Sequence, residues 1–334
     1  MSAPVRAAAA RRDALQEIQS PVRERLDRVG QEMWRIVAED GALMPDVTRH
    51  LMGMKGKMFR PTLLLLASEV DDAGSDAALT MAAVVELIHL ATLVHDDAVD
   101  HSVLRRGMPT INALFSHQVS VIMGDFLYSR ALLELVERGD LEPLRVFTRA
   151  SNQLTLGEIR QLAAVDALAF SEADYEKLIR HKTAVLFRAA CEVGSLCGAE
   201  AHRQSLARYG ERLGMAFQVA DDLLDYTERQ ETTGKPSGLD LKEHKVTLPL
   251  IAALRTVSPA ARARVESLFA APEPTESAVL EVVEIVSEAG GLEYARRRGE
   301  EFAREAEDAL VGLPESPARA ALDEAIGYVM ERRW

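Results

Sequence analysis

The stretch His95-Asp96-Asp97-Ala98-Val99-Asp100 ends a long apolar segment, and Asp221-Asp222-Leu223-Leu224-Asp225 repeats its pattern later in the chain. Both contain Asp-Asp-x-x-Asp within runs whose composition is typical of helices. Carboxylates are rarely buried without partners, and like charges at positions i and i+4 destabilise a helix. Two unit charges about 4 Å apart repel by roughly 1 kcal/mol in water and about 4 kcal/mol at an effective dielectric near 20. A hard divalent cation is the simplest group that would offset this cost at both motifs.

The composition and the spacing of apolar residues both indicate a helical protein. The chain has 334 residues, of which 48% are hydrophobic and only 5% aromatic. Apolar positions recur every three to four residues nearly from end to end, and we find neither a convincing strand pattern nor a sequence repeat. We therefore predict one all-α domain over residues 1–334, a bundle of roughly a dozen helices, with residues 1–12 flexible.

The expected helices cover residues 13–38, 61–70, 76–100, 111–137, 143–168, 171–197, 201–227, 248–256, 259–269, 276–289, 291–310 and 316–332. Pro21 marks a break or a first turn in the first of them. Ser171 to Asp174 has the pattern of a capping box. The most conspicuous loop, 228–245, contains Gly234-Lys235-Pro236-Ser237-Gly238.

Charge and cysteine content narrow the classes of partner and compartment. A net charge of −13 argues against a nucleic-acid partner, which would need a basic footprint. Cys191 and Cys197 are the only cysteines and have the setting of small core residues, which suits a reducing compartment. No stretch of about 18 or more apolar residues reads as a membrane span, and the N-terminus lacks an apolar signal core. We expect a cytoplasmic protein with no membrane span.

The two acidic motifs have the spacing of metal ligands. On a helix Asp96 and Asp100 are one turn apart, about 5–6 Å between Cβ atoms. They could jointly hold an octahedral Mg²⁺ that keeps sites for water and substrate oxygens, while Asp97 points elsewhere. The same spacing pairs Asp221 with Asp225. Two such helices facing each other would clamp a diphosphate bridged by several Mg²⁺ ions.

Cations that could bind phosphate occur near both motifs. Lys57 and Arg60 precede an expected helix, where free N–H groups favour anions. Guanidinium groups bind phosphate with a planar fork, whereas a Lys ammonium acts as a point charge. The remaining candidates are Arg105, Arg106, Lys182, Lys235 and Lys245. Together they predict a site for two anions plus metal.

With these motifs, the chain resembles the trans-type polyprenyl diphosphate synthases of the isoprenyl diphosphate synthase family, from about Leu26 to Trp334. The matching segments, besides the aspartate motifs, are Gly-Lys-x-x-Arg-Pro at 56–61, Glu86 to His89, Arg105-Arg106-Gly107, Gly124 to Leu127, Lys182-Thr183, Phe217-Gln218 and Gly-Lys-Pro-x-Gly at 234–238. One departure is His244, where the family often has Gly before the lysine. The resemblance implies the isoprenoid synthase fold around a central cavity, and a homodimer.

The resemblance also implies a reaction and roles for the motif residues. The ionised allylic diphosphate (geranyl, farnesyl or geranylgeranyl) would alkylate isopentenyl diphosphate head to tail, with two or three Mg²⁺ ions. Asp96, Asp100 and Asp221 would be direct ligands, and Asp97, Asp222 and Asp225 near or second-layer metal partners. Arg105, Lys182, Lys235 and Lys245 would bind the allylic diphosphate, and Lys57, Arg60, His89 and Arg106 the isopentenyl diphosphate. Thr183 and Gln218 would steady the developing cation.

The residues before the first motif bear on product length. In the resembled family an aromatic residue four or five positions before the first Asp stops growth early, but here these positions hold Thr92 and Ala91. Ile88 adds no aromatic plug either. Because one helix turn rises roughly 5.4 Å, close to one extended isoprene unit, we predict a product of roughly six to ten units, suited to a quinone side chain. Candidate floors of the tunnel are Phe126, Tyr128, Leu132 and Leu133.

Other functions remain open from the sequence. A shorter geranylgeranyl or farnesylgeranyl diphosphate synthase is the main alternative, and a class I terpene cyclase would share the first motif. A His-Asp phosphohydrolase could use His89, His95 and His101 as metal ligands. A regulatory, non-catalytic subunit would generally lack the aspartate motifs that this chain keeps.

Overall fold

The computed structural model describes residues 14–38, 45–54, 56–105, 107–163, 167–227 and 238–331. Nearly all described residues are helical, so the predicted all-α class is confirmed. The elements in chain order are η1 (Ser20–Val22), α2 (Arg23–Ala38), α3 (Pro45–Gly53), α4 (Phe59–Ser68), α5 (Ala77–Val99), β1 (Leu104–Arg105), β2 (Met108–Pro109), α6 (Ile111–Leu114), α7 (His117–Glu137), α8 (Leu141–Ala163), η2 (Ala167–Ala169), α9 (Glu172–Ile179), η3 (Arg180–Ala184), α10 (Val185–Leu196), η4 (Glu200–His202), α11 (Arg203–Thr227), α13 (Leu239–Lys242), α14 (Leu248–Ala253), α15 (Pro259–Ala270), α16 (Glu276–Glu288), α17 (Gly291–Leu310) and α18 (Pro317–Met330).

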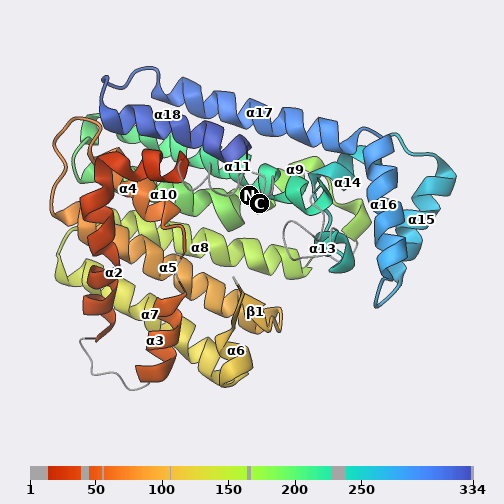
Figure 1. Cartoon of the computed structure of the whole chain (residues 1–334), viewed down its shortest axis with the longest axis horizontal. Helices are drawn as coiled ribbons and strands as arrows, with labels where there is room; N and C mark the ends of the chain where they lie inside the picture. The colour runs from red at the N-terminus through yellow and green to blue at the C-terminus, as the bar shows by residue number, and fades with distance from the viewer. Residues whose placement is uncertain are drawn as a thin grey trace, which may run out of the picture.

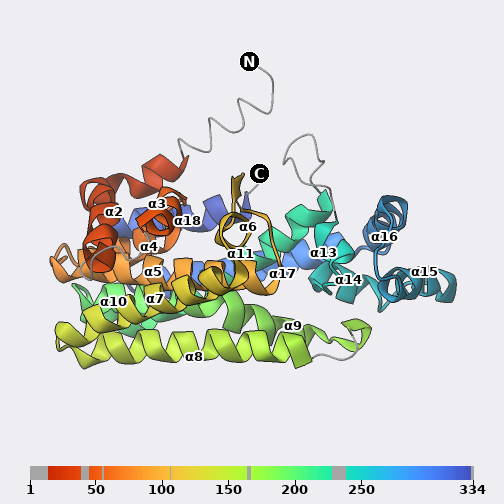
Figure 2. The same cartoon turned by 90° about the horizontal axis from the view of Figure 1, so that it is seen from below.

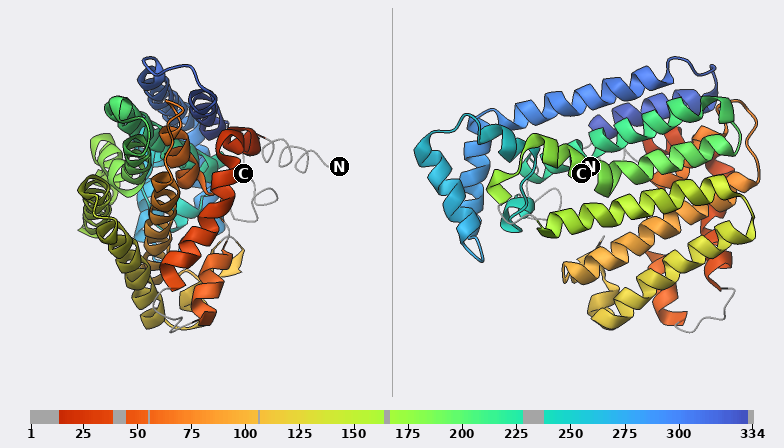
Figure 3. Two further views of the ribbon diagram at one scale, coloured as in Figure 1. Left: turned by 90° about the vertical axis from the view of Figure 1, so that its left-hand side faces the viewer. Right: turned by 180° about the vertical axis from the view of Figure 1, so that it is seen from behind.

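The long helices lie side by side along the molecule (Figure 1 and Figure 3). Helix α5 packs against α4 and α7, and α11 packs against α10 and α17. The hairpin of α15 and α16 projects at the end of the bundle where α5 and α11 also finish (Figure 1). The C-terminal ends of α5 and α11, which carry the two aspartate motifs, therefore lie toward the same end of the bundle.

Helix α5 is the central apolar element. It is 23 residues long and apolar enough to cross a membrane by length and composition, so the prediction that no stretch has these properties is wrong. However, 72% of its apolar window is buried inside the protein, as in the core helix of a bundle. The close packing of the core also shows at Gly194 of α10, where a Cβ atom would lie 2.2 Å from the carbonyl oxygen of Leu64 in α4.

The structure differs locally from the expected elements. Helix α3 and the short antiparallel hairpin of β1 and β2, which turns at Gly107 with a φ of 75°, were not predicted. The stretch 111–137 is two helices, because the Ser116 hydroxyl accepts a hydrogen bond from the Val119 N–H and starts α7 afresh. Pro21 lies in the 3₁₀ turn η1, and the capping box at Ser171 and Asp174 is present, both as predicted.

Candidate active site

The first aspartate motif closes α5, and its carboxylates have different surroundings. Asp96 is half-buried, and burial raises its pKa to about 6, opposed by the nearby Lys182. Asp97 is buried and accepts a hydrogen bond from Arg105 Nε at 2.7 Å. Asp100 is exposed, at the position that ends the helix. The two residues predicted to be direct metal ligands here, Asp96 and Asp100, are thus more accessible than Asp97.

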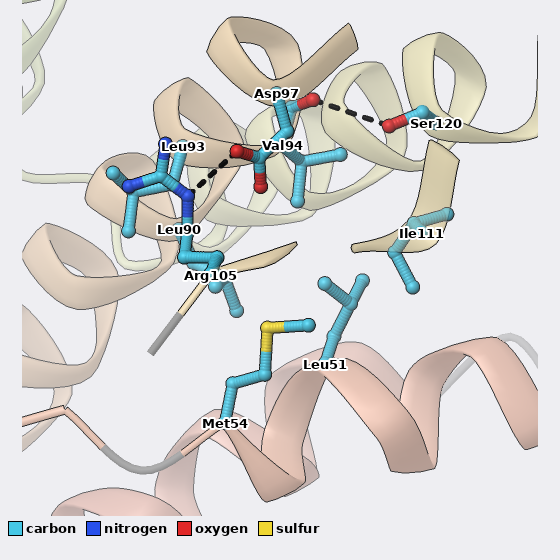
Figure 4. Close-up of a pocket in the computed structure, with 9 residues that line it drawn as sticks. All are labelled: Leu51, Met54, Leu90, Leu93, Val94, Asp97, Arg105, Ile111 and Ser120. Carbon is cyan, nitrogen blue, oxygen red and sulfur yellow. Dashed lines mark hydrogen bonds and ion pairs between the residues drawn. The ribbon is translucent and has the colours of Figure 1, made fainter. Parts of the chain in front are cut away.

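Arg105 reaches Asp97 from β1, and the pair lies at an apolar crevice between α3 and α5 (Figure 4). The crevice is lined by Leu51, Met54, Leu90, Leu93, Val94, Asp97, Arg105, Ile111 and Ser120. Burial raises the pKa of Asp97 and the hydrogen bond from Arg105 opposes that change. Arg105, predicted to bind the allylic diphosphate, is therefore held against the first motif.

The second aspartate motif lies at the end of α11 and, like the first, contains both accessible and buried carboxylates. Asp221 is exposed, whereas Asp222 is buried with both oxygens occupied. Asp222 accepts hydrogen bonds from the Tyr175 hydroxyl at 2.6 Å and from Gln218 Nε2 at 2.8 Å. Burial raises the pKa of Asp222 well above its usual value, and these two hydrogen bonds oppose that effect. Asp222 therefore supports the site through Gln218 and Tyr175.

Asp225 holds the segment that follows the second motif. Its carboxylate accepts hydrogen bonds from the backbone N–H groups of Leu239 and Asp240, both at 3.0 Å, and so caps α13. Burial raises the pKa of Asp225 despite these bonds. Helix α13 lies within the predicted loop 228–245, and Lys235, a predicted ligand of the allylic diphosphate, falls outside the described residues.

Lys182 and Thr183 lie on η3, one π-helical turn between α9 and α10. Such single π turns often mark functional sites, because the extra residue re-aims neighbouring side chains. Lys182 Nζ lies 2.9 Å from Glu158 Oε1 and 3.1 Å from Gln161 Oε1 of α8. Thr183 donates a hydrogen bond to Gln218 Oε1 of α11 at 2.7 Å. The π turn thus links α8 to the second motif.

Lys245 is half-buried after α13, and its Nζ lies 2.6 Å from Glu243 Oε2. Burial alone would lower its pKa, but the hydrogen bond to Glu243 and the charges of Asp240 and Asp100 raise it. His244, the departure from the family pattern, has a φ of 58°, the left-handed conformation that favours glycine.

Lys57 and Arg60 lie on an aromatic cluster at the start of α4. Arg60 Cζ lies 4.8 Å from the Phe187 ring centroid, and Lys57 Nζ lies 5.7 Å from that of Tyr328. Phe59 contacts the rings of Phe187, Phe217 and Tyr328. Stacking on aromatic faces holds both cations in place. His89 is half-buried on α5, and Arg106 is outside the described residues.

The predicted chain-length residues line successive turns of α5. Ile88 and Ala91 are buried, whereas Thr92 is half-buried with its hydroxyl bonded to the His89 carbonyl at 2.7 Å. Of the candidate floors on α7, Phe126, Tyr128 and Leu132 are half-buried, and Leu133 is 41% exposed.

Several residues at the site were missed from the sequence. Tyr175 and Gln161 were not predicted as site residues; Tyr175 contacts α11 from α9, and Gln161 contacts Lys182 from α8. Glu158 stands in a stretch of α8 with no motif of its own. Asp240 is half-buried, and burial raises its pKa to about 7. These residues lie in segments without a recognisable short motif, so the sequence alone does not place them at the site.

The His-Asp phosphohydrolase hypothesis finds no support in the geometry. The His95 ring bonds the Val121 carbonyl at 3.2 Å and faces Asp125, while the His101 ring packs on that of His117. Among the described residues, no three His, Cys, Asp or Glu side chains, those of the aspartate motifs included, lie close enough together to hold a metal ion.

Comparison with known proteins agrees with the motifs. The Polyprenyl synthetase family matches residues 42–286. Octaprenyl diphosphate synthase of Escherichia coli is 40% identical over 286 residues, 85% of this chain and 88% of that protein. A crystal structure of a decaprenyl diphosphate synthase from Rhodobacter capsulatus is 36% identical, has a TM-score of 0.89, and covers 95% of this chain and 98% of its own. A polyprenyl synthase from Caulobacter crescentus, solved with calcium and isoprenyl diphosphate, is 34% identical with a TM-score of 0.89, over 96% of this chain and 98% of its own.

The chain belongs to the polyprenyl synthetase family and is a prenyltransferase, as its motifs predicted.

Proposed function

We propose that this prenyltransferase condenses isopentenyl diphosphate head to tail onto geranyl, farnesyl or geranylgeranyl diphosphate and makes a medium-to-long all-trans product. The relatives named octaprenyl and decaprenyl diphosphate synthases support this length. So does α5, where Ala91 and Thr92 place no aromatic ring before Asp96. A product of roughly six to ten isoprene units, at about one unit for each 5.4 Å helix turn, suits a quinone side chain.

The observation that carries the proposal is the pairing of accessible carboxylates with cations at one end of the bundle. Asp96, Asp100 and Asp221 offer oxygen ligands of the kind that Mg²⁺ prefers, and Mg²⁺ usually keeps several waters and binds substrate phosphates beside one or two carboxylates. The related Caulobacter crescentus structure contains calcium with isoprenyl diphosphate, which supports a divalent ion. We propose two or three Mg²⁺ ions, which would neutralise the diphosphate as it leaves.

The side chains of the site would have different roles in the reaction. Lys182, Arg105, Lys235 and Lys245 would hold the allylic diphosphate, and Lys57, Arg60, His89 and Arg106 the isopentenyl diphosphate. The hydroxyl of Thr183 and the amide oxygen of Gln218 would face the developing cation. Preorganised groups of this kind stabilise charge where it forms. Asp97, Asp222 and Asp225, which bond Arg105, Gln218 and α13 respectively, would maintain the surrounding geometry.

We also propose a cytoplasmic, single-domain homodimer. Helices α7 and α8 lie next to each other on one long face (Figure 2). They expose large apolar side chains, including Ile122 at 60%, Val136 at 57% and Ile159 at 54%. Large apolar side chains exposed on two adjacent helices support an interface between copies of the chain. A purified chain that sediments as a monomer at micromolar concentration would contradict the dimer.

The purified chain should be incubated with isopentenyl diphosphate, farnesyl diphosphate and Mg²⁺, and the products separated by length. Products of roughly 30 to 50 carbons, absent after EDTA treatment and restored by Mg²⁺, are expected. Products no longer than geranylgeranyl diphosphate would contradict the proposed length. Consumption of farnesyl diphosphate when isopentenyl diphosphate is left out would indicate a cyclase. Activity that requires a second added protein would indicate a partner subunit.

A further inference from the structure

Tyr175 is fully buried, and its hydroxyl bonds a carboxylate of the second aspartate motif. The residue lies on α9 with 1% exposure, and its oxygen lies 2.6 Å from Asp222 Oδ2. Burial, followed by the negative charge of Asp222, raises the pKa of the Tyr175 hydroxyl well above its usual value, so it remains a donor. A buried carboxylate needs such donors, because the desolvation of a charge without partners is costly.

The bond from Tyr175 is one of three that link four side chains, and two of them converge on the Asp222 carboxylate. Asp222 Oδ1 accepts from Gln218 Nε2 at 2.8 Å, and Gln218 Oε1 accepts from Thr183 Oγ1 at 2.7 Å. The chain therefore extends from α9, through two residues of α11, to the π turn η3. Asp222 is 5% exposed and Thr183 8% exposed, so little water competes for these bonds.

The direction of the bonds fixes the amide of Gln218. Two side-chain donors favour the ionised form of Asp222, which only accepts hydrogen bonds, so the NH₂ group of Gln218 faces Asp222 and its oxygen faces Thr183. The Thr183 proton is then used by Gln218, which leaves the lone pairs of the threonine oxygen turned elsewhere. Hydrogen bonds in a chain polarise one another, so the Asp222 charge makes the Gln218 oxygen more negative. Both oxygens become better partners for a positive carbon.

We propose that Tyr175 is a positioning residue for prenyl transfer: it fixes Asp222, and Asp222 in turn orients Gln218 and Thr183. This inference rests on the roles proposed above for Thr183 and Gln218. Without the tyrosine hydroxyl, the Asp222 carboxylate loses one of its two side-chain donors and is free to rotate. The amide of Gln218 then loses its fixed direction, whereas the cations that bind diphosphate keep theirs.

The test is Tyr175→Phe, which removes one oxygen and keeps the ring. We expect kcat to fall roughly 10-fold while KM for both diphosphates changes less than about 3-fold, since the lost bond acts on the transition state. Tyr209→Phe is the matched control. Tyr209 is also fully buried, on α11, and its hydroxyl donates to the Leu322 carbonyl at 2.7 Å, away from this chain of bonds. It should lose thermal stability to a similar extent and keep the kcat of the parent enzyme.

A second comparison separates the inference from the proposed roles. Thr183→Val should lower kcat, and adding Tyr175→Phe to it should lower kcat little further, because both changes break one pathway. If Thr183→Val and Gln218→Leu leave kcat unchanged, their proposed roles are wrong. If Thr183→Val and Gln218→Leu lose activity but Tyr175→Phe keeps kcat within about 2-fold, the positioning role is overturned. It is also overturned if the fold-losses in kcat of Tyr175→Phe and Thr183→Val multiply in the double variant. If Tyr175→Phe does not fold, Asp222→Asn tests the same step, and an unchanged kcat in that variant overturns it too.

Discussion

Arg105 Nε donates to Asp97 Oδ1 across 2.7 Å, so the hairpin after the first aspartate motif is tied to the buried member of that motif. The Asp97 side chain is 5% exposed and that of Arg105 is 30% exposed. Removing one partner of such a pair leaves a buried charge without compensation. The pair therefore couples the stability of this end of α5 to the position of a predicted substrate-binding cation.

Arg105→Gln should destabilise the protein by about 2 kcal/mol, less than a fully buried pair would lose because Arg105 is partly exposed. The double variant Arg105→Gln/Asp97→Asn should recover most of this loss, since the buried charge is gone. Urea denaturation of the parent, Arg105→Gln, Asp97→Asn and the double variant measures the coupling free energy between the two residues. A double variant that is no more stable than Arg105→Gln would contradict the account.

Asp96→Ala should lower turnover at least about 100-fold while the helical circular-dichroism spectrum stays intact, because a metal ligand is lost and no core contact is. Asp76→Asn is the matched control. Asp76 is exposed at the other end of the same helix and makes no side-chain capping bond. Turnover of the Asp96 variant near that of the control would refute the ligand role.

Ala91→Phe should shorten the product, because a buried ring on α5 would block growth past the first turn before Asp96. Leu93→Phe is the control, since Leu93 faces the crevice beside α3 and Met54 instead (Figure 4). Chromatography of the hydrolysed products gives the chain length of each. Equal product lengths from Ala91→Phe and the parent would mean that the chain grows along another face.

The helices could be predicted because their apolar period is long and regular. The helix over residues 291–310 has the predicted bounds. Gly290, with a φ of 75°, stands immediately before it. Residues 171–197 were predicted as one helix, but the sequence has no signal for the π turn at 180–184, because one extra residue barely disturbs the apolar spacing. Helix α3 is short, and the packing that buries Val47 and Leu51 joins it to segments far along the chain.

The acidic motifs were predictable as a site, but the division of labour within them was not. Asp96 and Asp97 are adjacent and identical in chemistry, yet one is accessible and the other faces Arg105. Asp222 has its partners on α9 and on its own helix. These differences follow from tertiary packing around each carboxylate, which a one-dimensional spacing does not contain.

The stability of the metal-free protein should fall as pH rises through neutrality, because burial and the charge of Asp225 raise the pKa of Asp240 to about 7. A raised folded-state pKa gives stability that is fully present below the unfolded value, near 4, and is lost as pH rises through about 7. Asp240→Asn cannot ionise, so it should unfold at higher temperature than the parent at pH 8 and differ less at pH 5. Scanning calorimetry in EDTA at both values measures this. An equal difference at the two values would exclude Asp240 as the source.

His244 occupies a left-handed position that glycine adopts more easily, with a φ of 58°. Its ring offsets the strain, since a ring nitrogen lies 2.9 Å from the Ala271 carbonyl oxygen and the ring packs edge-on against Phe269. His244→Ala loses these contacts and keeps the strain, whereas His244→Gly loses the contacts and relieves it. The glycine variant should therefore be more stable than the alanine variant by about 0.5–1 kcal/mol. Denaturant unfolding compares the two. An alanine variant as stable as the glycine variant would show that the backbone at this position relaxes out of the left-handed region when the ring is removed.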